Sequence, residues 1–238
     1  MRPQLPRAAP APPAGVAKFD PDGALTEAHA RAFSPSRGEL LAAAAGLGAM
    51  ALLAGRTRAL GAEAGLSRQD ADILNYALGL EYLQSAFYTE AERRGALRGK
   101  AARAAAEIGA VERAHVAAFR KVLGDAAAHP AFYDFRGVTE DQNAFLRTAV
   151  AFEDLAVAAY KGQAALIQSP AVLEAALAIH SVEARHAAWI RYLYGVQPAE
   201  RPFDAPSSRP AVERLVASTG FVVRRPRTGA AGPPPFTG

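Results

Sequence analysis

Eight polar residues recur in two matched halves of this 238-residue chain, and their types could hold metal ions. Each half contains a glutamate, then a tyrosine, then a Glu-x-x-His motif. The glutamate and the tyrosine recur after 72 residues (81 to 153, 88 to 160), and the Glu-x-x-His motif after 71 (112 to 183). The residues are Glu81, Tyr88, Glu112, His115, Glu153, Tyr160, Glu183 and His186. Carboxylates and imidazoles on an apolar face are costly unless they are paired, so the repeat indicates a shared ligand.

These residues lie on the apolar stripes of segments with helical periodicity. Residues three or four apart share a helix face, so Glu112 and His115 lie beside Ile108 rather than on the polar side. Four carboxylates balance the charge of two divalent cations, and neutral imidazoles add nitrogen donors. Mixed oxygen and imidazole ligation suits iron or manganese. The sequence therefore predicts two bound iron ions, with manganese or a mixed iron/manganese pair as the alternative.

Four amphipathic segments are expected to position these residues. They span residues 67–94, 99–123, 139–168 and 170–195. Ser67 with Asp70 is typical of a capped helix start, Gly95 of a helix end, and Pro170 of a first turn. Short turns within each pair predict two antiparallel hairpins. Residues 125–138, when extended, can reach roughly 46 Å, and a helix of 26 residues is about 39 Å long. The predicted fold is all-α, an up-down four-helix bundle with one long crossover between the second and third helices.

The beginning of the chain has the composition of a leader. Residues 1–35 are rich in Pro, Ala and Arg and are expected to be disordered. Residues 36–64 combine a charged flank, a short apolar run and an Ala-x-Ala sequence, as export signals do. The run is too short for a stable membrane span. The order of residues resembles a twin-arginine leader, although Gly38 replaces the second arginine. Export to the periplasm or the outside is expected, with a cytoplasmic location as the alternative.

The remaining composition indicates the domain bounds, the cofactors that are excluded and the expected partners. The bundle is expected over residues 65–197, and the Pro/Gly/Arg-rich residues 198–238 are expected to form a tail with one short helix near 212–218. The absence of cysteine excludes disulfides, thiolate zinc sites and iron–sulfur clusters. The net charge of +4 is modest, and no basic stripe carries interleaved aromatic residues, so nucleic acid is not an expected partner. The expected partners are metal ions and O₂ or peroxide, and alanine-rich helix faces are compatible with a homo-oligomer.

The six carboxylate and imidazole residues, in this order, resemble the ferritin-like di-metal carboxylate superfamily. The Ala-Phe-x-Glu…Ala-Tyr run at Ala151–Tyr160 most resembles bacterial ferritin-like domain proteins related to desiccation-associated proteins. The resemblance implies one terminal glutamate and one histidine for each metal, and two bridging carboxylates. In that order the ligands would be Glu81 with His115, Glu153 with His186, and the bridging pair Glu112 and Glu183.

Two tyrosines and one further histidine lie on the same faces. Tyr88 and Tyr160 resemble the tyrosines that hold ligand carboxylates in related proteins, and plain core tyrosines are the alternative. His180 is expected to be a packing or surface residue, with a hydrogen-bond partner of a ligand or an extra ligand as the alternatives.

The resemblance implies a di-metal protein that oxidises ferrous iron or reduces O₂ or peroxide, with no catalytic residues beyond the metal ligands. Such an oxidase or peroxidase uses the redox chemistry of the metal pair, while the protein supplies geometry. The alternative is a non-catalytic metal-binding or stress- and desiccation-protective protein, which the lack of any cysteine-based redox module favours.

Overall fold

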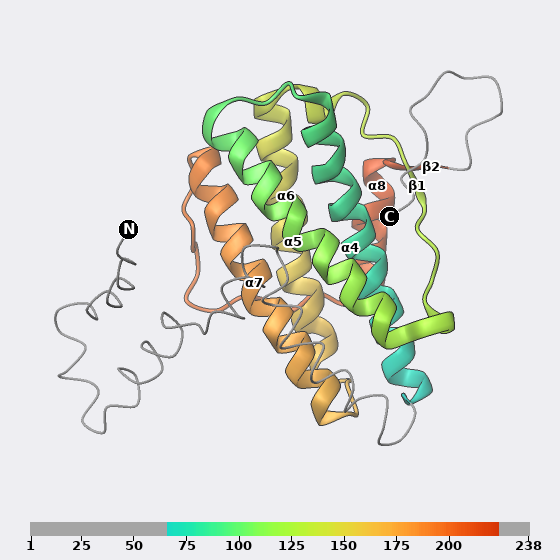
Figure 1. Cartoon of the computed structure of the whole chain (residues 1–238). Helices are drawn as coiled ribbons and strands as arrows, with labels where there is room; N and C mark the ends of the chain where they lie inside the picture. The colour runs from blue at the N-terminus through green and yellow to red at the C-terminus, as the bar shows by residue number, and fades with distance from the viewer. Residues whose placement is uncertain (1–65, 224–238) are drawn as a thin grey trace, which may run out of the picture. The chain divides into compact units, whose positions relative to one another are not determined.

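The structure, a computed structural model, describes residues 66–223, and this part of the chain is mostly helical (Figure 1). The predicted all-α bundle is therefore confirmed. The helices are α4 (Arg68–Arg94), α5 (Gly99–Leu123), α6 (Gln142–Ala164), α7 (Pro170–Tyr194) and α8 (Arg209–Thr219). The short elements are the 3₁₀ helices η2 (Gly124–Ala126) and η3 (Val138–Glu140) and the strands β1 (Phe132–Tyr133) and β2 (Val222–Val223).

The four long helices form two antiparallel hairpins, α4 with α5 and α6 with α7 (Figure 1). The connection from α5 to α6 runs back along the outside of the bundle, so that these two helices point the same way. This is the long crossover that the sequence predicts. Short turns force neighbouring helices to be antiparallel, whereas a crossover returns the chain to the end where it began.

Local sequence sets the ends of the first helix as predicted. The Ser67 side chain accepts a hydrogen bond from the backbone N–H of Asp70, which satisfies one of the free donors of the first turn. Gly95 ends α4 with a φ of 61°, a left-handed conformation that glycine adopts without strain.

The third helix, expected over about 139–168 with Thr139 or Asp141 near its start, begins after Asp141 and ends earlier than predicted, at Ala164. Thr139 lies in η3, and the side chain of Asp141 caps α6 by accepting from the N–H of Ala144. At the other end, the backbone N–H groups of Gln168 and Ser169 donate to the carboxylate of Asp70, at 2.8 and 3.0 Å. This contact with α4 holds the chain outside the helix after Ala164.

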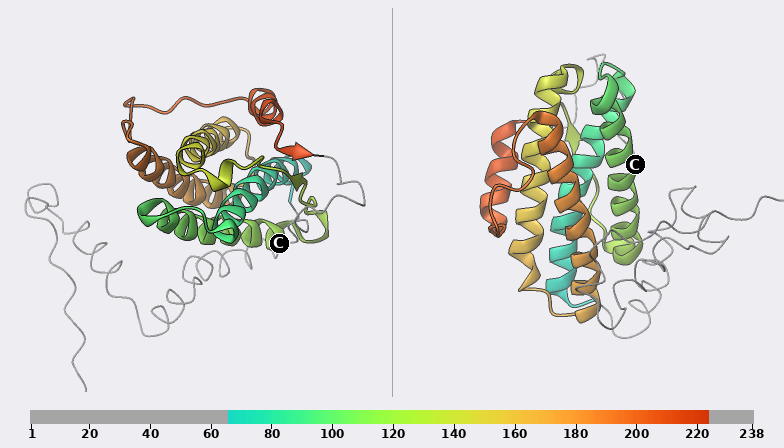
Figure 2. Two further views of the ribbon diagram at one scale, coloured as in Figure 1. Left: turned by 90° about the horizontal axis from the view of Figure 1, so that it is seen from above. Right: turned by 90° about the vertical axis from the view of Figure 1, so that its left-hand side faces the viewer.

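Two features at the C-terminal side differ from the predictions or were not predicted. The last helix is longer than the expected 212–218, because it begins after Ser208 with proline in its first turn. Strand β2 pairs antiparallel with β1, a link that ties the crossover to the end of α8. Figure 2 shows α8 on the outside of the bundle beside α6.

Residues 196–208, which we call the strap, lead from α7 to α8 across α6. The backbone N–H of Ser207 donates to the carbonyl of Ala158 at 2.9 Å. A Cβ atom at Gly162 would lie 1.9 Å from the carbonyl oxygen of Ser207, so only glycine allows this close approach. Beyond the strap, the fully buried Val212 of α8 packs on Tyr76, Leu80 and Ala159.

The expected disordered region 1–35, the export-signal-like segment 36–64 and the tail beyond residue 223 lie outside the described residues. Export therefore stays a prediction. Within 66–223, no helix combines the length and the apolar character needed to cross a membrane.

Candidate metal centre

The six carboxylate and imidazole residues converge from all four long helices onto one buried layer. Glu81 comes from α4 and Glu153 from α6, while α5 and α7 each supply a Glu-x-x-His motif. All four glutamates are 0% exposed, and both histidines are 7% exposed. Each residue sits in the middle of its helix, so rigid backbone positions the whole layer.

Within the described residues, the candidate ligand atoms form two overlapping groups. Glu81 and His115 complete one group, and Glu153 and His186 complete the other. Both groups contain Glu112 and Glu183, and the ligand atoms within each group lie within 4.8 Å of one another. Two carboxylates that belong to both groups, with one further Glu/His pair in each group, are the donor arrangement of two adjacent metal positions.

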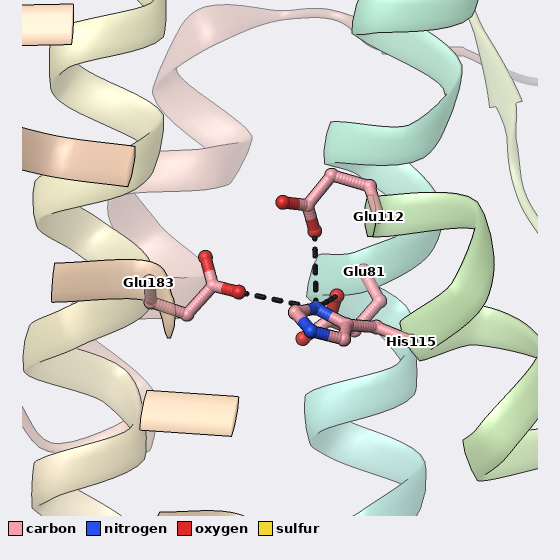
Figure 3. A group of neighbouring side chains, drawn as sticks. All are labelled: Glu81, Glu112, His115 and Glu183. Carbon is pink, nitrogen blue, oxygen red and sulfur yellow. Dashed lines mark hydrogen bonds and ion pairs between the residues drawn. The ribbon is translucent and has the colours of Figure 1, made fainter. Parts of the chain in front are cut away.

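The nitrogen that faces the carboxylates is Nδ1 in both histidines. Figure 3 shows His115 between three glutamates, with Nδ1 at 3.1 Å from Glu81 Oε2, 3.1 Å from Glu183 Oε1 and 3.5 Å from Glu112 Oε2. The sequence indicates imidazole ligation but not which ring nitrogen is used.

His186 repeats this arrangement in the second group. Its Nδ1 lies 3.0 Å from Glu112 Oε1, 3.6 Å from Glu153 Oε2 and 3.9 Å from Glu183 Oε2. The two imidazole rings are 6.5 Å apart between centroids. The two halves of the site are therefore close to equivalent.

Two tyrosines form hydrogen bonds to glutamates on the opposite helix of the bundle. The Tyr160 hydroxyl on α6 donates to Glu81 Oε1 on α4, and the Tyr88 hydroxyl on α4 donates to Glu153 Oε1 on α6. The hydroxyl of each tyrosine thus contacts the single glutamate of the other half, a pairing that sequence spacing alone does not show. In both glutamates Oε2 is the oxygen that turns to the histidine.

The chain matches the family model of the ferritin-like domain over residues 69–196, which is more than half of its length. The chain belongs to the ferritin-like family. The match covers all four long helices and hence all six ligand candidates of this ferritin-like protein. No curated protein matches the chain.

Several polar atoms of the ferritin-like centre lack hydrogen-bond partners in the described part of the protein. Among the described residues, both oxygens of Glu112 and of Glu183, Oε2 of Glu153 and Nδ1 of His186 are buried without hydrogen bonds. The short contacts to His186 therefore place atoms near one another without hydrogen-bond geometry. Buried polar atoms are normally paired, and oxygen and imidazole atoms converging on two points fit two hard or borderline cations. The residues present thus fit the metal pair.

The pKa shifts of the site also fit the binding of two metal ions. Burial and the charge of Glu81 raise the pKa of Glu112 to about 7. Burial and the charge of Glu112 raise the pKa of Glu183 well above its usual range. Burial opposes the positive charge on His186, but contacts with the carboxylates outweigh it and raise its pKa to about 10. The shared carboxylates of Glu112 and Glu183 therefore need nearby positive charge to ionise, and divalent cations would supply it.

Both tyrosines are held as neutral donors. Burial and the charge of the accepting glutamate raise the pKa of Tyr88 and of Tyr160 well above the usual value. Each hydroxyl therefore keeps its proton and can orient a carboxylate throughout the neutral range.

His180 belongs to neither group of candidate ligands. It is half-buried on α7, and the charged groups that act on it are Asp204 and Lys161. Burial lowers its pKa. This fits the expectation of a packing residue.

Proposed function

We propose that this ferritin-like protein binds two iron ions and uses them to oxidise ferrous iron or to reduce O₂ or peroxide. A manganese pair or a mixed iron/manganese pair is the alternative occupant. The observation that carries the proposal is the sharing of Glu112 and Glu183 by two buried groups of candidate ligands. Shared carboxylates hold two metals close enough to act on one small oxidant.

Each residue has a defined task in this proposal. Glu112 and Glu183 would be ligands of both metals. Glu81 with His115, and Glu153 with His186, would each supply the remaining protein ligands of one metal. When bound, the metals supply the electrons that reduce the oxidant. The helices exclude bulk water, since the four glutamates are 0% exposed. The tyrosines fix one oxygen of each terminal glutamate and leave the other oxygen for metal.

The test is to load the full-length chain with ferrous iron without oxygen, measure bound metal by mass spectrometry, and then record O₂ and peroxide consumption. The variant Glu112→Gln/Glu183→Gln removes the charge of both shared carboxylates. Glu107→Gln is the matched control, because this exposed glutamate of α5 pairs only with Arg103, at 2.8 Å, among the described residues.

About two irons per chain and oxidant consumption, both lost in the double variant and kept in the control, would support the proposal. Metal binding without oxidant consumption would favour the non-catalytic, protective alternative. If neither ferrous iron nor, in a parallel anaerobic loading, Mn²⁺ binds, the di-metal function is refuted.

A further inference from the structure

The two ends of the bundle on either side of the metal layer are filled differently. On the Tyr88 side, the ring of Phe87 lies 5.1 Å from those of Phe145 and Phe152 and 5.3 Å from that of Phe135. On the Tyr160 side, three alanines lie among the larger side chains, and a cavity of about 20 Å³ remains. A space of roughly 10–15 Å³ is enough for one molecule of the size of water.

All four long helices line this cavity, so it lies inside the bundle. Its wall is almost wholly apolar and includes Ala77, Ala159 and Ala176. Tyr160 and Leu80 also line it. Tyr160 both lines the cavity and donates its hydroxyl to Glu81, so this side chain connects the cavity with the metal layer.

A surface groove of about 350 Å³ lies outside the cavity, where α4, the end of α6 and the start of α8 meet. Groove and cavity share Ile73 and Gln163, which therefore form the constriction between them. Both residues are buried. Arg209 borders the groove and pairs with Asp72 at 2.8 Å. Farther along α8, Val212 packs on Tyr76 and Leu80 and covers this side of α4. The groove therefore opens to solvent beside the first turn of α8.

We propose that the groove, the constriction at Ile73 and Gln163, and the apolar cavity form the route by which dioxygen reaches the metal pair on the Tyr160 side. An apolar diatomic molecule loses little free energy on leaving water. Peroxide, water or a metal ion, once past the amide of Gln163, would find few of the hydrogen bonds or ligands it needs in the apolar cavity. The route therefore favours O₂. That the route ends at a metal pair rests on the proposed function, whereas the binding of an apolar gas in the cavity is independent of it.

The first experiment uses the full-length, metal-free protein and so does not depend on activity. Methyl relaxation is measured by NMR with dissolved O₂, and separately with a neutral hydrophilic gadolinium chelate. The methyl groups of Ala77 and Ala159 should respond to O₂ and not to the chelate. Ile108 and Ile190, which are 0% exposed on the filled side, are the internal controls. A response to O₂ at Ala77 and Ala159 no larger than at these controls would overturn the proposal.

The second experiment fills the cavity with Ala77→Leu, and Ala178→Leu at an exposed position of α7 is the control. In Ala77→Leu, the O₂ response of the Ala159 methyl should be lost. The loaded variant should bind as much metal as the parent but react more slowly with O₂, while its reaction with peroxide is unchanged. Equal slowing of both reactions would contradict a route selective for O₂. If this variant does not fold, the relaxation of the parent protein decides.

The outcomes separate the two proposals. A gas response in a protein that, when loaded, reacts with neither O₂ nor peroxide contradicts the proposed function and supports the cavity as a gas site. An O₂ reaction without a gas response supports the function and overturns the route.

Discussion

Replacing Tyr160 by phenylalanine removes one hydroxyl and should weaken only one half of the metal centre. The hydroxyl donates to Glu81 Oε1, in a layer where Glu81 is 0% exposed and no water can replace it. A hydrogen bond to a charged acceptor contributes about 1.5–3 kcal/mol. Tyr160→Phe should therefore lower the free energy of unfolding of the metal-free protein by about that amount. Loss of a group that orients a ligand typically lowers metal affinity about 10- to 100-fold.

The cross-bundle pairing makes the prediction specific. Chemical denaturation of the single and double variants gives the coupling energy between two side chains. Tyr160→Phe should couple to Glu81→Ala by about 1.5–3 kcal/mol, and clearly less to Glu153→Ala, although Tyr160 and Glu153 share a helix. Anaerobic calorimetric titration with Mn²⁺ should show one weakened site of two.

Tyr82→Phe on α4 is the matched control. Its hydroxyl donates to the carbonyl of Ala128 in the crossover, at 3.2 Å, and not to the metal layer. This variant should lose about 0.5–1.5 kcal/mol of stability and keep both metal affinities. Coupling of Tyr160 to Glu153 as strong as to Glu81, or equal metal affinities in both tyrosine variants, would refute the pairing.

Three further predictions follow from the packing. Phe87→Ala removes a ring that is 0% exposed at the centre of the aromatic cluster, and should lower the free energy of unfolding by about 3–5 kcal/mol in denaturant titrations. Asp70→Ala leaves two backbone N–H groups at the α6–α7 turn unpaired and should lower the free energy of unfolding by about 1–3 kcal/mol. Asp72→Ala, at an exposed position, should lower it far less, and equal losses in the two variants would contradict this. Gly162→Ala places a Cβ against the carbonyl of Ser207 and should make the strap sensitive to limited proteolysis, a change that an unaltered digestion pattern would exclude.

Local signals predicted the helices whose ends are set by nearby residues. Ser67 and Gly95 cap α4 with contacts inside one turn, and α5 begins and ends where its pattern indicates. The end of α6 could not be predicted in this way, because Asp70, nearly one hundred positions earlier in the chain, binds the N–H groups after it. The β1–β2 pair is equally non-local, and two-residue strands carry no periodic signal.

The candidate site was predictable because it depends on helix geometry. A Glu-x-x-His motif places both groups on one face wherever the helix lies, so the convergence of Glu112 with His115 and of Glu183 with His186 needed only the bundle topology. The partner of each tyrosine was not predictable from spacing. Tyr88 lies seven residues after Glu81 on the same helix, yet it binds Glu153, because the packing of α4 against α6 decides which carboxylate its hydroxyl meets.

The most direct test of the central claim is the EPR spectrum of the full-length chain after anaerobic loading with Mn²⁺, recorded together with the bound metal content. We predict about two ions per chain and the spectrum of a magnetically coupled pair, which requires the shared carboxylates Glu112 and Glu183. A spectrum of isolated ions, or a content of one ion or none, would contradict a dinuclear centre.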